Sequence, residues 1–378
     1  MKKKIYKKKI CIISTSRADY DLLKHFVKQC LESPYYKTYF IVTGSHLEKK
    51  SYSIRNIIKD KIDIYKKVKI NLISDNNISI SKSNAVSHVK FSKIFSKLRP
   101  EIIVLLGDRI EILPIAYSAF LQNIKIMHFN GGESTLGILD DGVRNAVTSL
   151  SNYHFVAHKN YKEKIIHMGK DSTKIFNVGS LSIDNCKNSK IFSKRKIENK
   201  FGFKFKKNNF LVTYHPNNLD KKLNINDLNN MLKSIKKYLS KDILFIFTGG
   251  NIDPLGIKNL KIIKRFIKKN YQNCIFVENF GGDFYLSTLH HVDCLIGNSS
   301  SGILEAPSYK KPVINIGSRQ GGRIKADNVI DVNGKEKEIN YAMKKAISKK
   351  FQKKIKNLKS PFDRGLTSMN TIKIINKF

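Results

Sequence analysis

The stretch that decides the fold runs from Glu101 to Asn145 and reads EIIVLLGDRIEILPIAYSAFLQNIKIMHFNGGESTLGILDDGVRN. Its first six residues, 101–106, are apolar and rich in β-branched side chains, as expected of a buried parallel strand. A helical pattern begins near Ile110, and a second strand is predicted over residues 124–129. A strand, a helix and a second strand in this order are typical of a parallel, doubly wound α/β sheet.

Charged residues follow both of these strands. Asp108 and Arg109 come after the first strand and Glu133 after the second, and a loop then carries Asp140 into a helix that bears Arg144. Ligands of open α/β sheets bind outside the carboxyl ends of the strands. We therefore expect these five side chains to converge on one crevice. Three carboxylates and two arginines would form a catalytic site for an anionic substrate in this crevice.

The same alternation of strands and helices runs through the rest of the chain. In the first half, strands are predicted over 9–14, 37–43, 68–73, 153–157 and 174–178, and helices over 20–31 and 83–98. In the second half, strands are predicted over 210–214, 243–248, 274–277, 292–296 and 312–316. We expect two Rossmann-like domains, 1–183 and 208–360, facing each other across a cleft. The polar segment 184–207 would link them, and a final helix within 361–378 would pack back on the first domain.

Composition excludes several classes of protein. The formal net charge is +40, but the basic residues are spread over nearly every helical segment, and no zinc-finger, basic-heptad or RNA-binding motif is present. No apolar run approaches the roughly 18–20 residues of a membrane span. The five cysteines are scattered without a C-x-x-C pair, and no H-E-x-x-H or comparable ligand spacing occurs. We expect a cytoplasmic protein without a metal, a nucleic-acid partner or a membrane partner.

A first candidate phosphate-binding turn is STSRADY, residues 14–20, which joins a strand to a helix. Such a turn presents backbone N–H groups and the positive end of a helix to an anion, and Arg17 adds a planar fork suited to phosphate. The alternative is that Ser16 or Asp19 only caps the helix. The P-loop and G-x-G-x-x-G patterns are absent, which counts against a kinase or a simple dehydrogenase.

A second candidate turn is GNSSSGILE, residues 297–305. Ser299 and Ser300 could donate hydrogen bonds to phosphate oxygens, and Glu305 could accept both hydroxyls of a ribose. The alternative is a capping arrangement that satisfies the helix alone. His215 follows a predicted strand and precedes a proline, so a contact to phosphate or to a leaving group competes with simple packing. His128 is interpreted as a residue that orients the GGE turn.

Eight segments that span most of the chain carry a resemblance to a known family. They are SRADY (16–20), GDR (107–109), HFNGGE (128–133), DDGVRNA (140–146), HP (215–216), NID (251–253), GNSSSGILEAP (297–307) and GSRQGGR (317–323). In this order they resemble the UDP-N-acetylglucosamine 2-epimerase family, and within it the hydrolysing branch of sialic and legionaminic acid biosynthesis. The resemblance implies a GT-B-like pair of Rossmann domains with UDP in the cleft, no cofactor, and a homodimer or homotetramer.

The resemblance also implies a reaction and the residues that perform it. Removal of the proton at carbon 2 with anti expulsion of UDP would give a 2-acetamidoglucal, and addition of water would release N-acetylmannosamine and UDP. This needs a placed base and a cationic site for the departing diphosphate. The resemblance places catalysis on Asp108, Glu133, Asp140 and Arg144. It places UDP contacts on Arg17, Arg109, His215, Asn251, Ser299, Ser300, Glu305 and Arg319.

Two positions depart from the pattern of the family. Non-hydrolysing relatives have a glutamate where this chain has Asn130. This difference favours the hydrolysing branch and assigns the catalytic role of that glutamate to Glu133. It leaves open which carboxylate removes the proton. Many relatives have a lysine where this chain has Leu22, which weakens the case for phosphate binding by the amino-terminal loop.

Four alternatives stay open. The same chemistry could act on UDP-N,N'-diacetylbacillosamine, or the enzyme could be a non-hydrolysing epimerase. A GT-B glycosyltransferase would not need the cluster of Asp108, Glu133 and Asp140. A basic nucleic-acid-binding protein would show steeply salt-dependent binding that is independent of Asp108.

Overall fold

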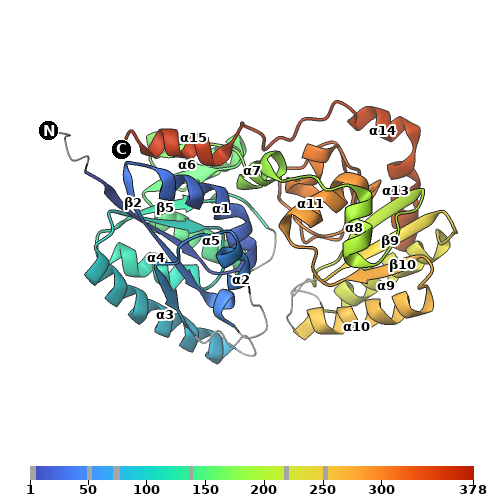
Figure 1. Cartoon of the computed structure of the whole chain (residues 1–378), viewed down its shortest axis with the longest axis horizontal. Helices are drawn as coiled ribbons and strands as arrows, with labels where there is room; N and C mark the ends of the chain where they lie inside the picture. Colours follow the sequence, from blue (N-terminus) through green and yellow to red (C-terminus); the bar gives the residue numbers. More distant parts are fainter. Residues whose placement is uncertain (1–5, 49–52, 71–76, 136–138, 217–220, 250–253) are drawn as a thin grey trace. The chain divides into compact units, whose positions relative to one another are not determined.

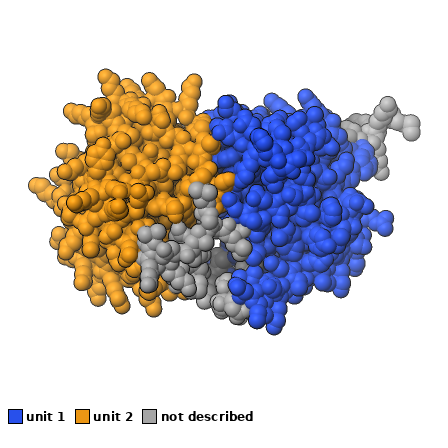
Figure 2. All heavy atoms as spheres, turned by 180° about the vertical axis from the view of Figure 1, so that it is seen from behind, with its two compact units in different colours: residues 1–133, 139–185, 362–378 blue, residues 134–138, 186–361 orange. Residues whose placement is uncertain are grey.

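Each half of the chain builds its own parallel sheet. The computed structural model describes residues 6–48, 53–70, 77–135, 139–216, 221–249 and 254–378. The chain divides into unit 1, residues 1–133, 139–185 and 362–378, and unit 2, residues 134–138 and 186–361 (Figure 2). In the described residues the two sheets have seven and six strands, and neighbouring strands are parallel. The predicted doubly wound α/β class is confirmed.

Unit 1 contains the seven-stranded sheet, whose strands lie in the order β3-β2-β1-β4-β5-β6-β7. The strands are β1 (Lys8–Ser14), β2 (Tyr36–Thr43), β3 (Lys66–Val68), β4 (Ile102–Leu106), β5 (Lys125–Phe129), β6 (Tyr153–Val156) and β7 (Ile175–Asn177). The helices are α1 (Arg17–Glu32), α2 (Ile54–Lys59), α3 (Asn77–Leu98), α4 (Ile112–Phe120), α5 (Leu139–Leu150), α6 (Lys159–His167), α7 (Leu181–Asn188) and α15 (Thr367–Ile375).

Side-chain alternation along β1 explains why helices cover both faces of this sheet. Ile10 and Ile12 belong to a buried cluster that includes residues of α1 and α15. Cys11 and Ile13 belong to a second cluster with residues of α3, α4 and α5. Successive side chains of a strand point to opposite faces, so a strand with four consecutive apolar residues, 10–13, needs cover on both faces. Figure 1 shows α1 and α15 on one side of the sheet and α3 and α4 on the other.

Unit 2 repeats this plan with strands in the order β10-β9-β8-β11-β12-β13. The strands are β8 (Asn208–Thr213), β9 (Ile243–Thr248), β10 (Cys274–Val277), β11 (Cys294–Gly297), β12 (Val313–Ile316) and β13 (Val329–Val332). The helices are α8 (Lys194–Phe201), α9 (Lys221–Lys237), α10 (Pro254–Lys269), α11 (Gly282–His291), α12 (Ser301–Leu304), α13 (Glu336–Ile347) and α14 (Lys349–Ile355). One face of the sheet packs on α9, α10 and α13, and the other packs on α8 and α11.

All predicted strands except one agree with the structure to within two residues at each end, and one observed strand was not predicted. The strand expected over 68–73 is instead the short β3, Lys66–Val68, and residues 71–73 lie outside the described residues. Strand β13 was not predicted, because its only buried positions, Ile330 and Val332, alternate with more accessible ones over four residues. No helix in the described part of the chain is both long and apolar enough to cross a membrane.

Residues 184–207, expected as a polar linker, are helical over much of their length. They include the end of α7 and all of α8. Helix α8 begins at a cap in which the Ser193 side chain accepts a hydrogen bond from the backbone N–H of Lys196, and it ends at Gly202, whose φ is 71°. Only Ile197 of this helix is buried, so no apolar period marks it in the sequence.

The final helix, α15, packs against α1 and is anchored by Asp184 of α7. The fully buried carboxylate of Asp184 accepts hydrogen bonds from the backbone N–H groups of Thr367, at 2.6 Å, and Ser368, at 2.8 Å, and also from the Ser368 hydroxyl. The first N–H groups of a helix have no partner within the helix. Asp184 therefore acts as a cap supplied from another part of unit 1.

We predict that Asp184→Ala destabilises unit 1 by about 2–4 kcal/mol, because it leaves buried N–H donors without an acceptor. Hydrogen exchange over 367–375 should speed up in this variant. Ser368→Ala removes only one of the donors and should cost about 1 kcal/mol. Unchanged exchange of α15 in Asp184→Ala would contradict the capping role.

Candidate functional site

Several of the predicted site residues that the structure describes follow the carboxyl ends of strands in the two sheets. In unit 1 the strand order reverses between β1 and β4, and in unit 2 it reverses between β8 and β11. Open α/β sheets bind ligands at the carboxyl ends of the strands that flank such a reversal. The residues that follow these four strands include Arg17, Asp108, Arg109, His215, Ser299 and Ser300. Each unit therefore carries its own set of candidate site residues.

Arg144, on α5, gathers acidic and carbonyl groups of unit 1. Its side chain is 1% exposed and forms ion pairs with the carboxylates of Asp108 and Asp141. The same guanidinium donates to the backbone carbonyl of Glu133 at 2.9 Å. Burial works against a positive charge, but the carboxylates of Asp108, Glu133 and Asp141 raise the pKa of Arg144. Because a buried charge is tolerated only when paired and hydrogen-bonded, Arg144 ties the ends of β4 and β5 to the first turn of α5.

Asp140 and Asp141 are adjacent residues in the first turn of α5. Asp140, the predicted catalytic residue, is exposed in the first turn of α5. Asp141 is the residue that pairs with Arg144 three positions later, on the same face of the helix. Asp141 was not among the predicted site residues, although its spacing of three residues from Arg144 was a usable signal.

His128, on β5, holds the turn that presents Asp108. Its Nε2–H donates to the carbonyl of Gly107 at 2.7 Å, and its Nδ1 accepts from the Thr148 hydroxyl at 3.1 Å. Burial lowers the pKa of His128 to about 4, so the ring is neutral near pH 7 and the carbonyl fixes the proton on Nε2. The histidine therefore orients the GDR turn directly, in addition to lying beside the GGE turn.

The GGE turn has no room for side chains at its glycines. A Cβ at Gly132 would lie 2.4 Å from the carbonyl oxygen of Tyr161, and its φ of +75° is one that glycine adopts most readily. A Cβ at Gly131 would lie 3.1 Å from Nδ1 of His128. Glu133 follows these glycines, is 3% exposed and lies beside Arg144.

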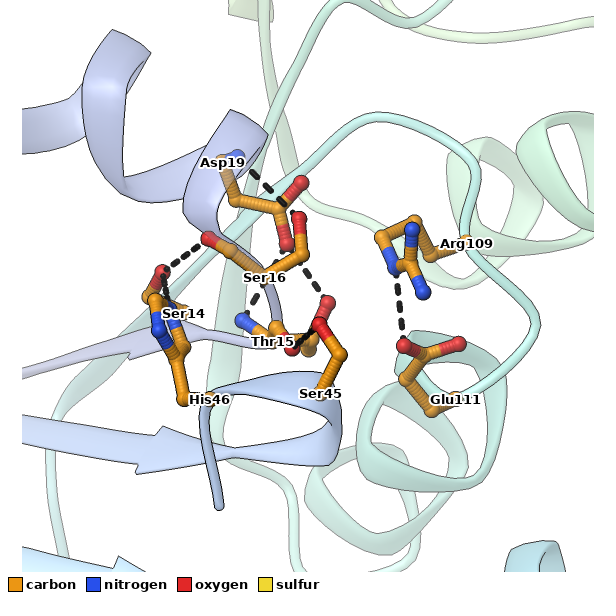
Figure 3. A network of polar contacts seen from close by, with 8 residues as sticks. All are labelled: Ser14, Thr15, Ser16, Asp19, Ser45, His46, Arg109 and Glu111. Carbon is orange, nitrogen blue, oxygen red and sulfur yellow. Dashed lines mark hydrogen bonds and ion pairs between the residues drawn. The ribbon is translucent and has the colours of Figure 1, made fainter. Parts of the chain in front are cut away.

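The loop after β1 is held by short polar contacts (Figure 3). Ser16 caps α1 by accepting from the N–H of Asp19 at 3.3 Å, as the alternative sequence interpretation expected. Asp19 in turn accepts from the N–H and the hydroxyl of Thr15, at 3.1 and 2.5 Å. Arg17, the first residue of α1, is exposed. The predicted phosphate contact of Arg17 would therefore use a side chain on the surface of this unit.

Arg109 is bound to a buried carboxylate that the sequence argument missed. Its Nε donates to Oε1 of Glu111 at 2.8 Å, and the two side chains are 37% and 1% exposed. Burial opposes the positive charge, yet the carboxylates of Glu111 and Asp19 raise the pKa of Arg109. The guanidinium thus remains charged at the carboxyl end of β4.

In unit 2, Asn298 joins the two turns at the strand reversal. Its side-chain Oδ1 accepts from the N–H of His215 at 2.7 Å, and its Nδ2 donates to the carbonyl of His215 at 2.9 Å. Its backbone carbonyl accepts from Arg319 at 3.0 Å and from Gln320 at 2.9 Å. A Cβ at the preceding Gly297 would lie 1.9 Å from the Thr213 carbonyl oxygen, so only glycine fits. Asn298 thereby positions His215, the serine turn and Arg319 relative to one another.

His215, Ser299 and Glu305 are further predicted nucleotide contacts in this part of unit 2. Burial, and then the charge of Arg319, lowers the pKa of His215 to about 3, so this histidine is neutral near pH 7. Ser299 accepts from the N–H of Ser301 at 3.3 Å, which is a local cap. Glu305 follows the single turn of α12. Asn251 lies outside the described residues, and no cluster of three or more potential metal ligands occurs within them.

Comparison with known proteins gives consistent matches. A family model described as UDP-N-acetylglucosamine 2-epimerase matches residues 28–376. The chain is 35% identical to the GDP/UDP-N,N'-diacetylbacillosamine 2-epimerase (hydrolyzing) of Campylobacter jejuni over 346 residues, covering 92% of this chain and 89% of that protein. It is 32% identical to the polysialic acid biosynthesis protein P7 of Escherichia coli over 375 residues, covering 98% and 94%.

The fold is similar to that of a crystal structure of UDP-GlcNAc 2-epimerase from Neisseria meningitidis bound to UDP-GlcNAc. The TM-score is 0.83 at 16% sequence identity, and the match covers 98% of this chain and 100% of that one. This similarity shows the GT-B-like fold that the sequence predicted.

The buried neutral state of His128 predicts a pH-dependent stability. An unfolded histidine binds its proton near pH 6.5, whereas folded His128 does so only near pH 4. Between these values the unfolded state holds more protons, so stability falls as the pH falls. His128→Gln should flatten this dependence by up to about 1.4 kcal/mol per pH unit. Urea unfolding read by hydrogen exchange in β5 measures it, and an identical slope in both proteins would contradict the assignment.

Proposed function

Since this chain belongs to the UDP-N-acetylglucosamine 2-epimerase family, we propose that it is a hydrolysing epimerase of a UDP-linked 2-acetamido sugar. UDP-N-acetylglucosamine is the substrate that the sequence favours, and the products are then N-acetylmannosamine and UDP. No metal or cofactor is part of this proposal.

The assembly around Arg144 carries the proposal. It holds the Asp108 carboxylate, whose side chain is 25% exposed, at the carboxyl end of β4, with Glu133 beside it. The hydrogen on carbon 2 of the sugar is only weakly acidic, so its removal needs a carboxylate fixed in place by its surroundings. A buried guanidinium that binds Asp108 fixes the position of that carboxylate.

The reaction balances without an external reagent. One carboxylate takes the proton from carbon 2, the bond from carbon 1 to the diphosphate oxygen breaks, and its electron pair leaves with UDP while the double bond forms. Water then adds its hydroxyl to carbon 1 and gives its remaining proton to a carboxylate, and a protonated carboxyl group returns a proton to the opposite face of carbon 2. Asp108, Glu133 and Asp140 are the proposed acids and bases, with Arg144 as their positively charged partner.

The nucleotide is assigned mainly to residues of unit 2. In the described part of the chain the N–H groups of Ser299 and Ser300 donate no hydrogen bond, so they are free for phosphate oxygens. Neutral His215 supplies a hydrogen bond rather than a charge, and Arg319 supplies the charge. Glu305 is proposed for the ribose, Asn251 for a further UDP contact, and Arg17 and Arg109 of unit 1 for the departing diphosphate.

Position 130 supports the hydrolysing type. Asn130 has a φ of 60°, in the left-handed region that asparagine tolerates better than glutamate. Its N–H donates to the Phe155 carbonyl at 3.1 Å, which fixes this backbone. A catalytic glutamate at this position, as in non-hydrolysing relatives, would be strained here, and Glu133 takes its place in the proposal.

UDP-N,N'-diacetylbacillosamine is the second candidate substrate. The 35% identity to the Campylobacter jejuni enzyme favours it. It carries the same 2-acetamido group and the same bond to UDP, so the elimination chemistry is unchanged, and only the groups at carbons 4 and 6 distinguish the two sugars.

Incubation of the purified protein with each sugar nucleotide tests the proposal. The expected result is release of UDP together with an equal amount of the free 2-epimeric sugar, identified by mass spectrometry and chromatography. Formation of UDP-N-acetylmannosamine without free UDP would establish the non-hydrolysing alternative. Transfer of the sugar to an acceptor would establish a glycosyltransferase.

We predict that Asp108→Asn and Glu133→Gln each lower kcat by roughly 10²–10⁴-fold, because each removes a group that can accept or return a proton. Affinity for UDP should change little, since neither carboxylate is assigned to the nucleotide. Asp171→Asn is the matched control, because Asp171 is a solvent-accessible carboxylate whose bonds to described residues are confined to its own 3₁₀ turn and Lys174. Wild-type turnover in both site variants would rule out the assigned roles.

A further inference from the structure

The guanidinium of Arg109 forms a hydrogen bond through only one of its three nitrogens among the described residues. Its Nε donates to Glu111, and among the described residues its Nη1 and Nη2 donate to no acceptor. A guanidinium has five N–H donors in a rigid plane, so four remain available on the edge that matches a phosphate. The side chain is 37% exposed, so this edge is accessible.

Glu111 is fixed from a second side by the turn after β2. The side chain is 1% exposed, and burial of a carboxylate is costly unless a cation compensates it. A Cβ at Gly44 would lie 3.2 Å from Oε1 of Glu111 and 2.7 Å from the Thr15 carbonyl oxygen. The φ of Gly44 is +59°, so this close approach depends on glycine.

The same turn holds the loop after β1. The Ser45 hydroxyl donates to the Thr15 carbonyl at 3.2 Å, and the buried His46 ring lies 2.8 Å from the Ser14 hydroxyl. Figure 3 shows Asp19 of this loop opposite Arg109, and its carboxylate adds to the attraction that keeps Arg109 charged. One polar network therefore joins the carboxyl ends of β2, β1 and β4, which are neighbours in the sheet.

We propose that Glu111 is a positioning residue that holds Arg109 with its free edge toward the diphosphate of the nucleotide sugar, with Asp19 as a weaker electrostatic support. This inference rests on the proposed function. A free arginine side chain loses rotamer entropy when it binds a ligand. Glu111 imposes that order before the ligand arrives, so more of the phosphate interaction contributes to affinity.

A double-mutant cycle separates this role from general stability. Affinity for UDP is measured calorimetrically in wild type, Glu111→Gln, Arg109→Ala and the double variant. Glu111→Gln should weaken UDP binding roughly tenfold when Arg109 is present and have no further effect when Arg109 is absent. The same coupling should appear in kcat/KM. Equal weakening in both backgrounds, or none in either, overturns the inference.

Glu101→Gln is the matched control. It removes one negative charge at the amino end of the same strand, where Glu101 accepts from Tyr6 and from the backbone of Lys9, and UDP affinity should stay at the wild-type value. If thermal unfolding shows that Glu111→Gln is not folded, Asp19→Asn replaces it in the cycle, with a smaller effect that must again require Arg109.

Wild type distinguishes the two proposals. If it neither binds UDP nor releases UDP from a sugar nucleotide, the proposed function is wrong. If wild type does both and the effect of Glu111 or Asp19 does not depend on Arg109, only the positioning role is wrong.

Discussion

The first unit depends on compensating the positive charge of the buried Arg144 guanidinium. Arg144 is almost fully buried, so its ion pairs with Asp108 and Asp141 and its bond to the Glu133 carbonyl form as a set. This set joins two strand ends and the start of α5. Asp108 is both one of the carboxylates that compensate this charge and one of the proposed acids and bases, so in the proposal a single contact serves the fold and the chemistry.

Parallel strands explain why such groups gather. All carboxyl ends of a parallel sheet lie on one edge, and the reversal of strand order leaves that edge open between two neighbouring strands. In unit 1 the loops there are tied together by side chains, including Asp19, Glu111 and His46, and in unit 2 by the amide of Asn298. The polar contacts are short and largely buried, which keeps the turns rigid while charged edges such as that of Arg109 stay accessible.

The sequence predicted the strands well because those buried on both faces are apolar runs with few other interpretations. It predicted less where burial is partial, as in β3, β13 and α8. For the candidate site, motifs singled out Asp108, Arg109 and His215, whose roles stay predictions. They could not reveal Glu111, whose side chain is buried against Arg109. Asp141 was not predicted either, although it lies three residues before Arg144 and pairs with it. Such partners depend on which face of a turn points inward, and adjacent acidic residues look alike in a sequence.

The most direct measurement is a proton NMR time course with UDP-N-acetylglucosamine, and with the bacillosamine nucleotide, in deuterated water. The account predicts that the free sugar released with UDP carries one deuterium at carbon 2, because the proton lost to a carboxylate exchanges with solvent before another is returned. A free sugar released with ordinary hydrogen at carbon 2 would contradict removal of that proton by the carboxylates around Arg144.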